Sequence, residues 1–179
     1  MKAIYYEKYG NISVLKQGEI DDPKKVSDKE VLIKVNFFSL NPLDYKLRNG
    51  MLKLMTFRTF PRTTGSDFSG EIIAKGESVN NFEIGEKVFG FLSQLNEGTS
   101  SQFIKVNQSI LSRAPSNIDI GKAAAVPLAA LTSYQALVQL AKIKKGNKVL
   151  INGASGGTGI FAIQIAKIFG AKVTSITSH

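Results

Sequence analysis

The sequence predicts a β-rich domain followed by the beginning of an α/β domain with a doubly wound parallel sheet. Residues 1–119 contain short apolar and β-branched stretches separated by Gly, Asn and Pro, a pattern typical of a small barrel or sandwich. Residues 148–178 instead show a strand, a glycine-rich turn, an apolar helix and a second strand. We therefore expect one domain over 1–122 and a second over 123–179, which begins with a connecting helix.

The elements of the first domain follow from local patterns. Pro42 fits the first turn of a short helix with Asn41 as its N-cap, and Gly50 ends this helix. A loop is expected from Met51 to Thr64, and a helix that ends at Ala125, before Pro127. Strands are expected at 2–6, 14–20, 31–40, 68–75, 87–92, 101–106 and 109–112.

The second domain opens with a longer helix over 128–142 and then the buried strand Val149–Ile151. A helix over 160–169 and a strand over 172–177 complete a βαβ unit. Glycines in its first turn allow backbone N–H groups to approach a pyrophosphate, beside the positive end of the helix dipole. The predicted cofactor-binding residues are Ser155, Gly156, Gly157, Thr158 and Gly159; the alternative is a glycine-rich turn without a ligand.

The end of the second strand indicates which dinucleotide binds. NAD sites usually carry an Asp or Glu about 20 residues after the glycines. Residues 174–178 contain only Thr, Ser and Ile, and no acidic residue follows Asp119. A 2′-phosphate would therefore meet hydroxyl groups without repulsion, so we predict NADP(H) in preference to NAD(H). Ser175, Thr177 and Ser178 are the predicted ribose and phosphate neighbours, unless they form an ordinary strand end.

Composition excludes several classes of protein. The chain has no cysteine and one histidine, His179, which removes disulfides, thiolate catalysis and cysteine-ligated zinc. There is no transmembrane segment and no signal-peptide pattern, so a cytoplasmic location is expected.

Residues 120–179 hold seven lysines and no acidic residue. Nucleic acid is one explanation of this charge, but no nucleic-acid motif or aromatic interleaving accompanies it. An electrostatic funnel for an anionic dinucleotide is the simpler explanation.

Five stretches carry a family resemblance: FFSLNPLDYKLRNG at 37–50, PRTTGSDFSGEI at 61–72, VNNFEIGEKVFG at 79–90, AAAVPLAALTSYQAL at 123–137 and NGASGGTGIFAIQIAK at 152–167. Together they resemble the medium-chain dehydrogenase/reductase family, and most closely its zinc-free quinone oxidoreductase (zeta-crystallin-like) branch. The resemblance implies a GroES-like β-rich domain joined to a Rossmann domain. It also implies metal-free hydride transfer from NADPH to a quinone or an α,β-unsaturated carbonyl.

The zinc ligands of this family are replaced in the sequence. Zinc-dependent members carry a Cys that begins a motif ending in Asp, and a Gly-His-Glu motif. Here these positions read Asn41-Pro42-Leu43-Asp44 and Gly65-Ser66-Asp67. Because zinc needs thiolate and imidazole ligands, the resemblance implies a protein without a metal site.

The resemblance also implies roles for individual residues. Asn41 and Tyr45 match pocket positions from which they would hydrogen-bond a substrate carbonyl as negative charge develops on it. The alternatives are a plain helix cap for Asn41 and simple packing for Tyr45. Thr132 matches a position near the nicotinamide; its alternative is a helix hydroxyl bonded to its own backbone. Asp44 and Asp67 are expected to be structural.

A doubly wound domain has about six strands, so the sequence predicts that the chain is the N-terminal part of a longer protein. We expect its last strand to have an unpaired edge, and the chain to bind cofactor weakly and turn over poorly. The intact protein is a possible homodimer. One alternative is a non-catalytic binding or structural protein whose basic half contacts nucleic acid or a protein partner. Another is a reductase domain cut from a larger synthase.

Overall fold

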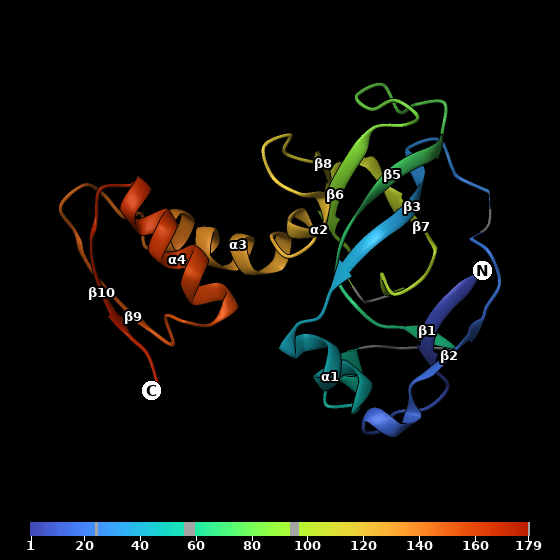
Figure 1. The fold of residues 1–179 in the computed structure, drawn as a ribbon, viewed down its shortest axis with the longest axis horizontal. Coiled ribbons are helices and arrows are strands. Elements are labelled where there is room, and N and C mark those ends of the chain that lie inside the picture. The colour runs from blue at the N-terminus through green and yellow to red at the C-terminus, as the bar shows by residue number, and fades with distance from the viewer. Residues whose placement is uncertain (24, 56–59, 94–96, 179) are drawn as a thin grey trace. The chain divides into compact units, whose positions relative to one another are not determined.

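The computed structural model describes residues 1–23, 25–55, 60–93 and 97–178, which form two compact units (Figure 1). Unit 1 covers Met1–Ala125 and unit 2 covers Val126–His179, although His179 itself lies outside the described residues. The division thus falls three residues after the boundary expected from the sequence. One helix ends at Ala123 and the next begins at Pro127, so the helical segment is interrupted before this proline as predicted.

Unit 1 is built on a five-stranded antiparallel sheet in the order β7-β3-β5-β6-β8. Alternate residues of β3 face the core, with Val31 and Ile33 fully buried. They pack with Phe68 and Ile72 of β5 and with residues of β6 and β7. The strands are β3 (Glu30–Ser39), β5 (Asp67–Lys75), β6 (Lys87–Phe91), β7 (Phe103–Asn107) and β8 (Leu111–Arg113).

A smaller antiparallel sheet in the order β2-β1-β4 completes the β structure of unit 1. The strand expected at 14–20 is shorter in the structure, because β2 covers only Lys16–Glu19. Val14 belongs to a 3-10 turn over residues 12–14, in which the Asn11 side chain accepts a hydrogen bond from the Ser13 N–H. The remaining elements are β1 (Lys2–Tyr6), β2 (Lys16–Glu19), β4 (Arg62–Thr63), α1 (Pro42–Arg48), α2 (Ile120–Ala123) and the 3-10 turns η1 (Ile12–Val14), η2 (Lys53–Met55) and η3 (Gln108–Ile110).

Unit 2 is a βαβ unit preceded by a helix. Strands β9 (Lys148–Asn152) and β10 (Lys172–Ile176) run parallel, with Lys172 opposite Lys148 and Ile176 opposite Asn152. Helix α4 (Gly157–Ile168) crosses between them and begins at the glycines, three residues earlier than expected. Helix α3 (Pro127–Tyr134) continues as the π-helix η4 (Gln135–Leu140), where one long helix was predicted.

The core of unit 2 lies between α4 and one face of its two-stranded sheet, around Ile151, Ala154 and Ala162. On the opposite face Leu150 is 64% exposed and Ile176 is 49% exposed. Among the described strands β10 pairs with β9 alone, as expected of an unpaired outer edge. No helix within the described parts of the chain is long and apolar enough to cross a membrane.

Candidate functional site

The first candidate site is the turn between β9 and α4. Gly153 leaves the strand with φ of +70°, a left-handed conformation that glycine adopts without strain. Gly156 is the N-cap of α4, and no side chain caps this helix. The first N–H groups of α4 are therefore available to an external acceptor. Ser155, Gly156, Gly157 and Thr158 are all exposed at this helix end, as a phosphate site requires.

Two glycines of the turn meet different surroundings. A Cβ on Gly159 would lie 2.4 Å from the Gly153 carbonyl oxygen and 2.6 Å from the Ala154 Cα, so a side chain cannot fit. A Cβ on Gly156 would approach only the Gly153 oxygen, at 3.3 Å. Gly159 thus permits close packing of the helix on the turn, and Gly156 leaves open space before the helix end. This division of roles fits a dinucleotide pyrophosphate.

The predicted ribose and phosphate neighbours lie at the same end of the sheet as the turn. Ser175 pairs with Ile151 in the last part of the parallel ladder. The Ala154 N–H donates to the Ile176 carbonyl over 3.0 Å, which ties the turn to the end of β10. Thr177 and Ser178 follow directly, and these two residues and Ser175 are exposed. Their hydroxyl groups therefore remain accessible to a ligand.

Thr132 lies on α3, and its hydroxyl donates to the Leu128 carbonyl over 2.7 Å. This bond is the backbone alternative considered from the sequence, so a role near the nicotinamide stays a prediction. Its neighbour Ser133, which sequence reasoning missed, is 2% exposed. The Ser133 hydroxyl lies 2.9 Å from the Ala129 carbonyl oxygen and 2.8 Å from that of Thr158. Ser133 thus holds the start of α4 against α3, and only the fold brings these residues together.

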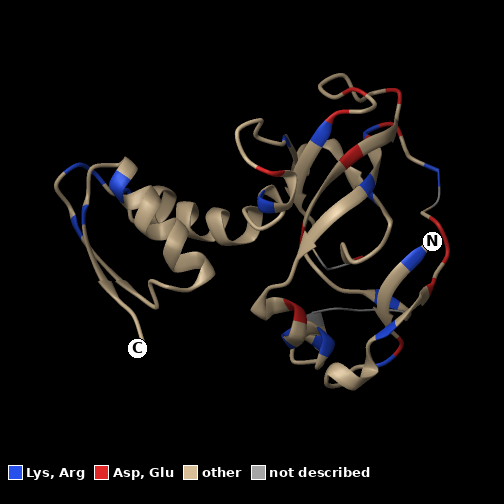
Figure 2. Ribbon diagram, in the orientation of Figure 1, with Lys and Arg blue, Asp and Glu red and all other residues tan. Residues whose placement is uncertain are grey.

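The lysines of unit 2 do not gather at the glycine turn. Lys148 begins β9 and Lys172 begins β10, with Lys142, Lys144 and Lys145 in the segment before β9 (Figure 2). These strand starts lie one strand length from the turn, roughly 16 Å for five residues. That distance exceeds the Debye length of about 8 Å at physiological salt. These lysines would therefore attract an anionic dinucleotide to the glycine turn only weakly.

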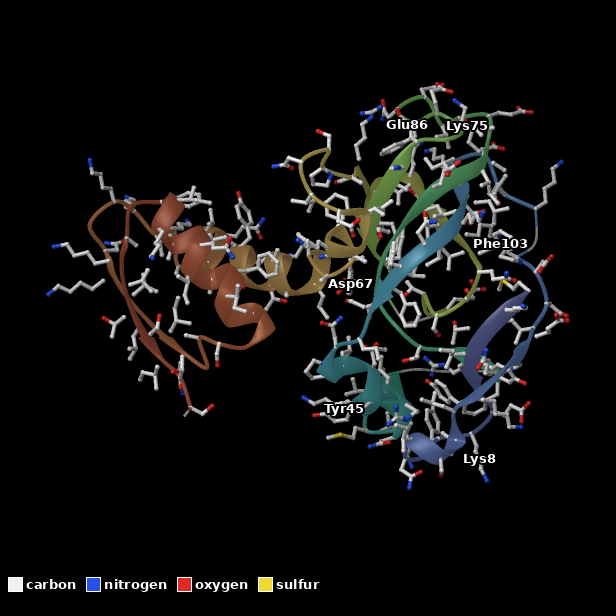
Figure 3. The ribbon with its side chains drawn as sticks, viewed as in Figure 1. Lys8, Tyr45, Asp67, Lys75, Glu86 and Phe103 are labelled. Atoms are coloured by element: carbon white, nitrogen blue, oxygen red, sulfur yellow. The ribbon has the colours of Figure 1, made fainter. Side chains whose placement is uncertain are left out.

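The second candidate site is in unit 1, around the start of α1. Asn41 is the N-cap of this helix and Tyr45 lies one turn further along, so both side chains belong to the same end of α1 (Figure 3). Tyr45 is 46% exposed, and no hydrogen bond of its hydroxyl is found within the described residues. The hydroxyl is therefore accessible to a substrate oxygen.

Two buried carboxylates surround Asn41. Asp44, 4% exposed, accepts from the Asn41 backbone N–H as in a capping box, and from the Gly65 N–H over 3.2 Å. Asp67, 1% exposed, accepts from the Asn41 side-chain nitrogen over 2.9 Å. The sequence identified both aspartates as structural. It did not show that they bind the same asparagine.

The positions at which the family resemblance implies zinc ligands hold an asparagine, Asn41, a buried serine, Ser66, and a buried aspartate, Asp67. Asn41 and Asp67 are bonded directly to each other. Within the described ranges, no group of three or more His, Cys, Asp or Glu side chains is arranged to hold a metal ion.

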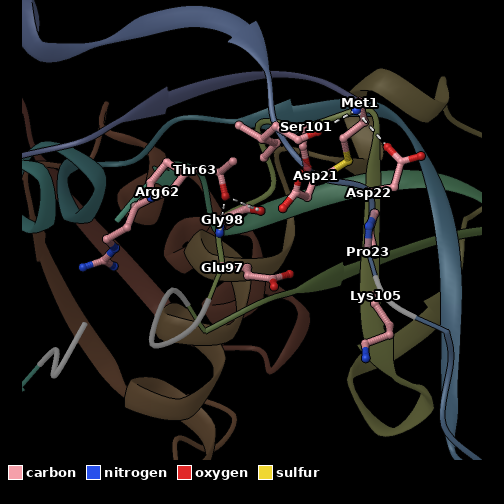
Figure 4. A pocket seen from close by; sticks show the side chains of 12 residues that line it. Met1, Asp21, Asp22, Pro23, Arg62, Thr63, Glu97, Gly98, Ser101 and Lys105 are labelled. Carbon is pink, nitrogen blue, oxygen red and sulfur yellow. Dashed lines mark hydrogen bonds and ion pairs between the residues drawn. The ribbon is translucent and has the colours of Figure 1, made fainter. Parts of the chain in front are cut away.

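A pocket of about 400 Å³ in unit 1 contains none of the predicted site residues (Figure 4). Its wall includes Arg62 and Thr63 of β4 and the segment Ile20–Pro23. The N-terminal amino group binds the Ile20 carbonyl and the Asp22 carboxylate at this wall, at 2.7 and 2.8 Å. The pocket is thus separate from both candidate sites in its residues.

Comparison with known proteins agrees with this fold. The Alcohol dehydrogenase GroES-like domain family matches residues 27–125. The chain is 37% identical to the Quinone-oxidoreductase homolog of Spinacia oleracea, covering 98% of this chain and 55% of that protein. It is 32% identical to the NADPH-dependent alkenal/one oxidoreductase of Arabidopsis thaliana, covering 99% and 47%.

A solved structure shows the same architecture. The quinone oxidoreductase from Coxiella burnetii superposes with a TM-score of 0.91 at 37% identity, covering 99% of this chain and 56% of that one. The chain therefore spans about half the length of the relatives it matches.

A GroES-like β-rich unit followed by a βαβ unit with a glycine turn defines a class of two-domain oxidoreductase folds, and the predicted fold class is confirmed. The chain belongs to the medium-chain dehydrogenase/reductase family, among relatives of the quinone oxidoreductase branch.

Proposed function

We propose that the protein is an NADPH-dependent reductase that acts without a metal on a quinone or an α,β-unsaturated carbonyl. The observation that carries the proposal is the uncapped N-terminus of α4, with the open space before Gly156 and the tight packing at Gly159. These features suit a dinucleotide pyrophosphate. The names of the relatives, a quinone oxidoreductase homolog and an alkenal/one oxidoreductase, support the substrate class. The cytoplasmic location stays a prediction.

Each group of residues has a distinct role in this proposal. The N–H groups at Gly157, Thr158 and Gly159 would bind the pyrophosphate, with Ser155 beside them. Thr132 would contact the nicotinamide end, and Ser175, Thr177 and Ser178 the ribose and its 2′-phosphate. The nicotinamide, when bound, supplies a hydride to an electrophilic double bond. Asn41 and Tyr45 would donate hydrogen bonds to the carbonyl oxygen on which negative charge then develops.

Cofactor preference is the first test of the proposal. We expect NADPH to bind the chain more tightly than NADH, because hydroxyl groups and no carboxylate follow β10. Fluorescence titration with both nucleotides at the same ionic strength measures the ratio of the two dissociation constants. Equal constants would contradict the NADP(H) assignment. Binding of nucleic acid that weakens steeply with salt, without NADPH consumption, would instead favour a non-catalytic protein.

The Tyr45 hydroxyl is the second test. We expect Tyr45→Phe to lower kcat for NADPH oxidation with cyclohex-2-enone by about tenfold or more, because one donor to the developing oxyanion is lost. The free energy of unfolding should change by less than about 0.5 kcal/mol, since the side chain is half exposed.

Tyr5→Phe on β1 is the matched control, because it removes a tyrosine hydroxyl from another part of unit 1. Equal rates for wild type and Tyr45→Phe would remove Tyr45 from the catalytic residues. The assay follows nucleotide absorbance, and acceptor product is quantified to show that oxidation and reduction balance.

A further inference from the structure

One carboxylate oxygen in unit 1, Asp67 Oδ2, accepts hydrogen bonds from two side chains, those of Ser39 and Asn41. Ser39 ends β3 and Asp67 begins β5, and the two residues are directly paired across the strands, so their side chains share a face. The Ser39 hydroxyl donates to Asp67 Oδ2 over 2.9 Å. Asn41 Nδ2 lies 2.9 Å from the same oxygen and 3.4 Å from Ser39 Oγ. Asp67 is 1% exposed, so water does not compete for it.

The three distances show which N–H of Asn41 is used. A triangle with sides of 2.9, 2.9 and 3.4 Å has an angle of about 54° at Nδ2, whereas the two N–H bonds of an amide diverge by about 120°. The two acceptors are therefore too close together to engage both N–H bonds. One N–H points toward Asp67 and Ser39, and the second points away from both. No hydrogen bond of this second N–H is found within the described residues.

Asp67 also decides which way the amide is turned. Its Oδ2 accepts from Ser39 Oγ and from Asn41 Nδ2, so the nitrogen of Asn41 faces the carboxyl group and the amide oxygen does not. Asp44 holds the backbone N–H of the same residue at the helix start. Asn41 is thus held at both its main chain and its side chain. The second side-chain N–H of Asn41 therefore points in one fixed direction. A donor that stabilises negative charge developing on a substrate oxygen needs such a fixed direction.

We propose that Asp67 is a positioning residue that turns the Asn41 amide so that one N–H remains for a substrate carbonyl. The proposal rests on the proposed function for the substrate carbonyl that the N–H would meet. The orientation of the Asn41 amide can be measured without any substrate. An amide at position 67 can either accept or donate, so Asp67→Asn would allow both orientations of Asn41. Ser39→Ala would remove one donor from Asp67 and leave the carboxylate itself in place.

Nuclear magnetic resonance of the 15N-labelled chain tests the orientation. The Asn41 side-chain signals are identified as the pair lost in Asn41→Ser, which keeps an N-cap residue. In the wild type we expect the two Nδ2 protons to be widely separated, because only one of them faces a carboxylate. Asp67→Asn should reduce this separation strongly, and Ser39→Ala should reduce it less. Unchanged Asn41 signals in Asp67→Asn would overturn the proposal.

Kinetics separates this proposal from the proposed function. With NADPH and cyclohex-2-enone we expect Asp67→Asn to lower kcat about tenfold and to change KM less than about twofold. Asp28→Asn, at an exposed carboxylate of unit 1, is the matched control and should change neither. If the wild type oxidises no NADPH while the Asn41 signals respond as expected, the proposed function fails and the orientation by Asp67 stands. If Asp67→Asn has wild-type kcat, Asp67 is not a positioning residue for the reaction.

Discussion

Gly159→Ala is expected to destabilise unit 2 by about 2–3 kcal/mol and to abolish NADPH binding. The added methyl group would lie 2.4 Å from the Gly153 oxygen and 2.6 Å from the Ala154 Cα. Both neighbours are backbone atoms, so neither can rotate away, and the start of α4 must move off the turn. Hydrogen exchange of peptides from residues 146–178, read by mass spectrometry, measures the loss of protection in this unit.

Gly156→Ala is the matched variant, three residues earlier in the same turn. Its methyl group would contact only the Gly153 oxygen, at 3.3 Å, and the backbone there is extended. We expect a stability change of less than about 1 kcal/mol. NADPH binding should nevertheless weaken by about tenfold or more, because the methyl group enters the space of the pyrophosphate. Wild-type affinity in Gly156→Ala would mean that the nucleotide does not bind at this turn.

Gly65→Ala is expected to destabilise unit 1 by about 3 kcal/mol. Gly65 has φ of +84°, where an alanine costs about 1–2 kcal/mol. Its new methyl group would also lie 2.4 Å from Thr99 Oγ1 and 3.2 Å from Phe38 Cδ2, which adds a steric cost of about 1–3 kcal/mol. Because the Gly65 N–H donates to Asp44, any shift would also loosen the start of α1.

Gly85→Ala isolates the backbone cost, because Gly85 has φ of +88° and a methyl group there would meet nothing within 4 Å. We expect about 1–2 kcal/mol from this control alone. Urea unfolding followed by tyrosine fluorescence suits the comparison, since four of the five tyrosines (Tyr5, Tyr6, Tyr9 and Tyr45) lie in unit 1. Equal losses in the two variants would show that Thr99 moves aside without cost.

Local patterns in the sequence were enough to predict most elements. β1 has the predicted bounds, and β3, β5 and β6 each lie within a residue of prediction, because β-branched and aromatic runs between Gly, Asn and Pro leave few alternatives. The errors occur where local hydrogen bonds or helix starts compete with the pattern. Val14, the first residue of one predicted strand, lies in η1, which the Asn11 side chain caps. Helix α4 begins at Gly157, before the predicted helix start at Ile160. The fold class, a β-rich domain followed by a βαβ unit, is confirmed.

For the candidate sites, the sequence by itself determined the residue types and their order. The spacing of the glycines predicted the glycine turn, and the hydroxyl residues without a carboxylate at 174–178 predicted NADP(H) in preference to NAD(H). Both are local, because a βαβ unit brings its own ends together. Only the tertiary structure decided that Asn41 and Asp67, which are 26 residues apart, share a hydrogen bond and that Ser39 joins them. The register of β3 on β5 creates that contact, and strand register depends on the packing of a whole sheet face, which no short stretch of sequence encodes.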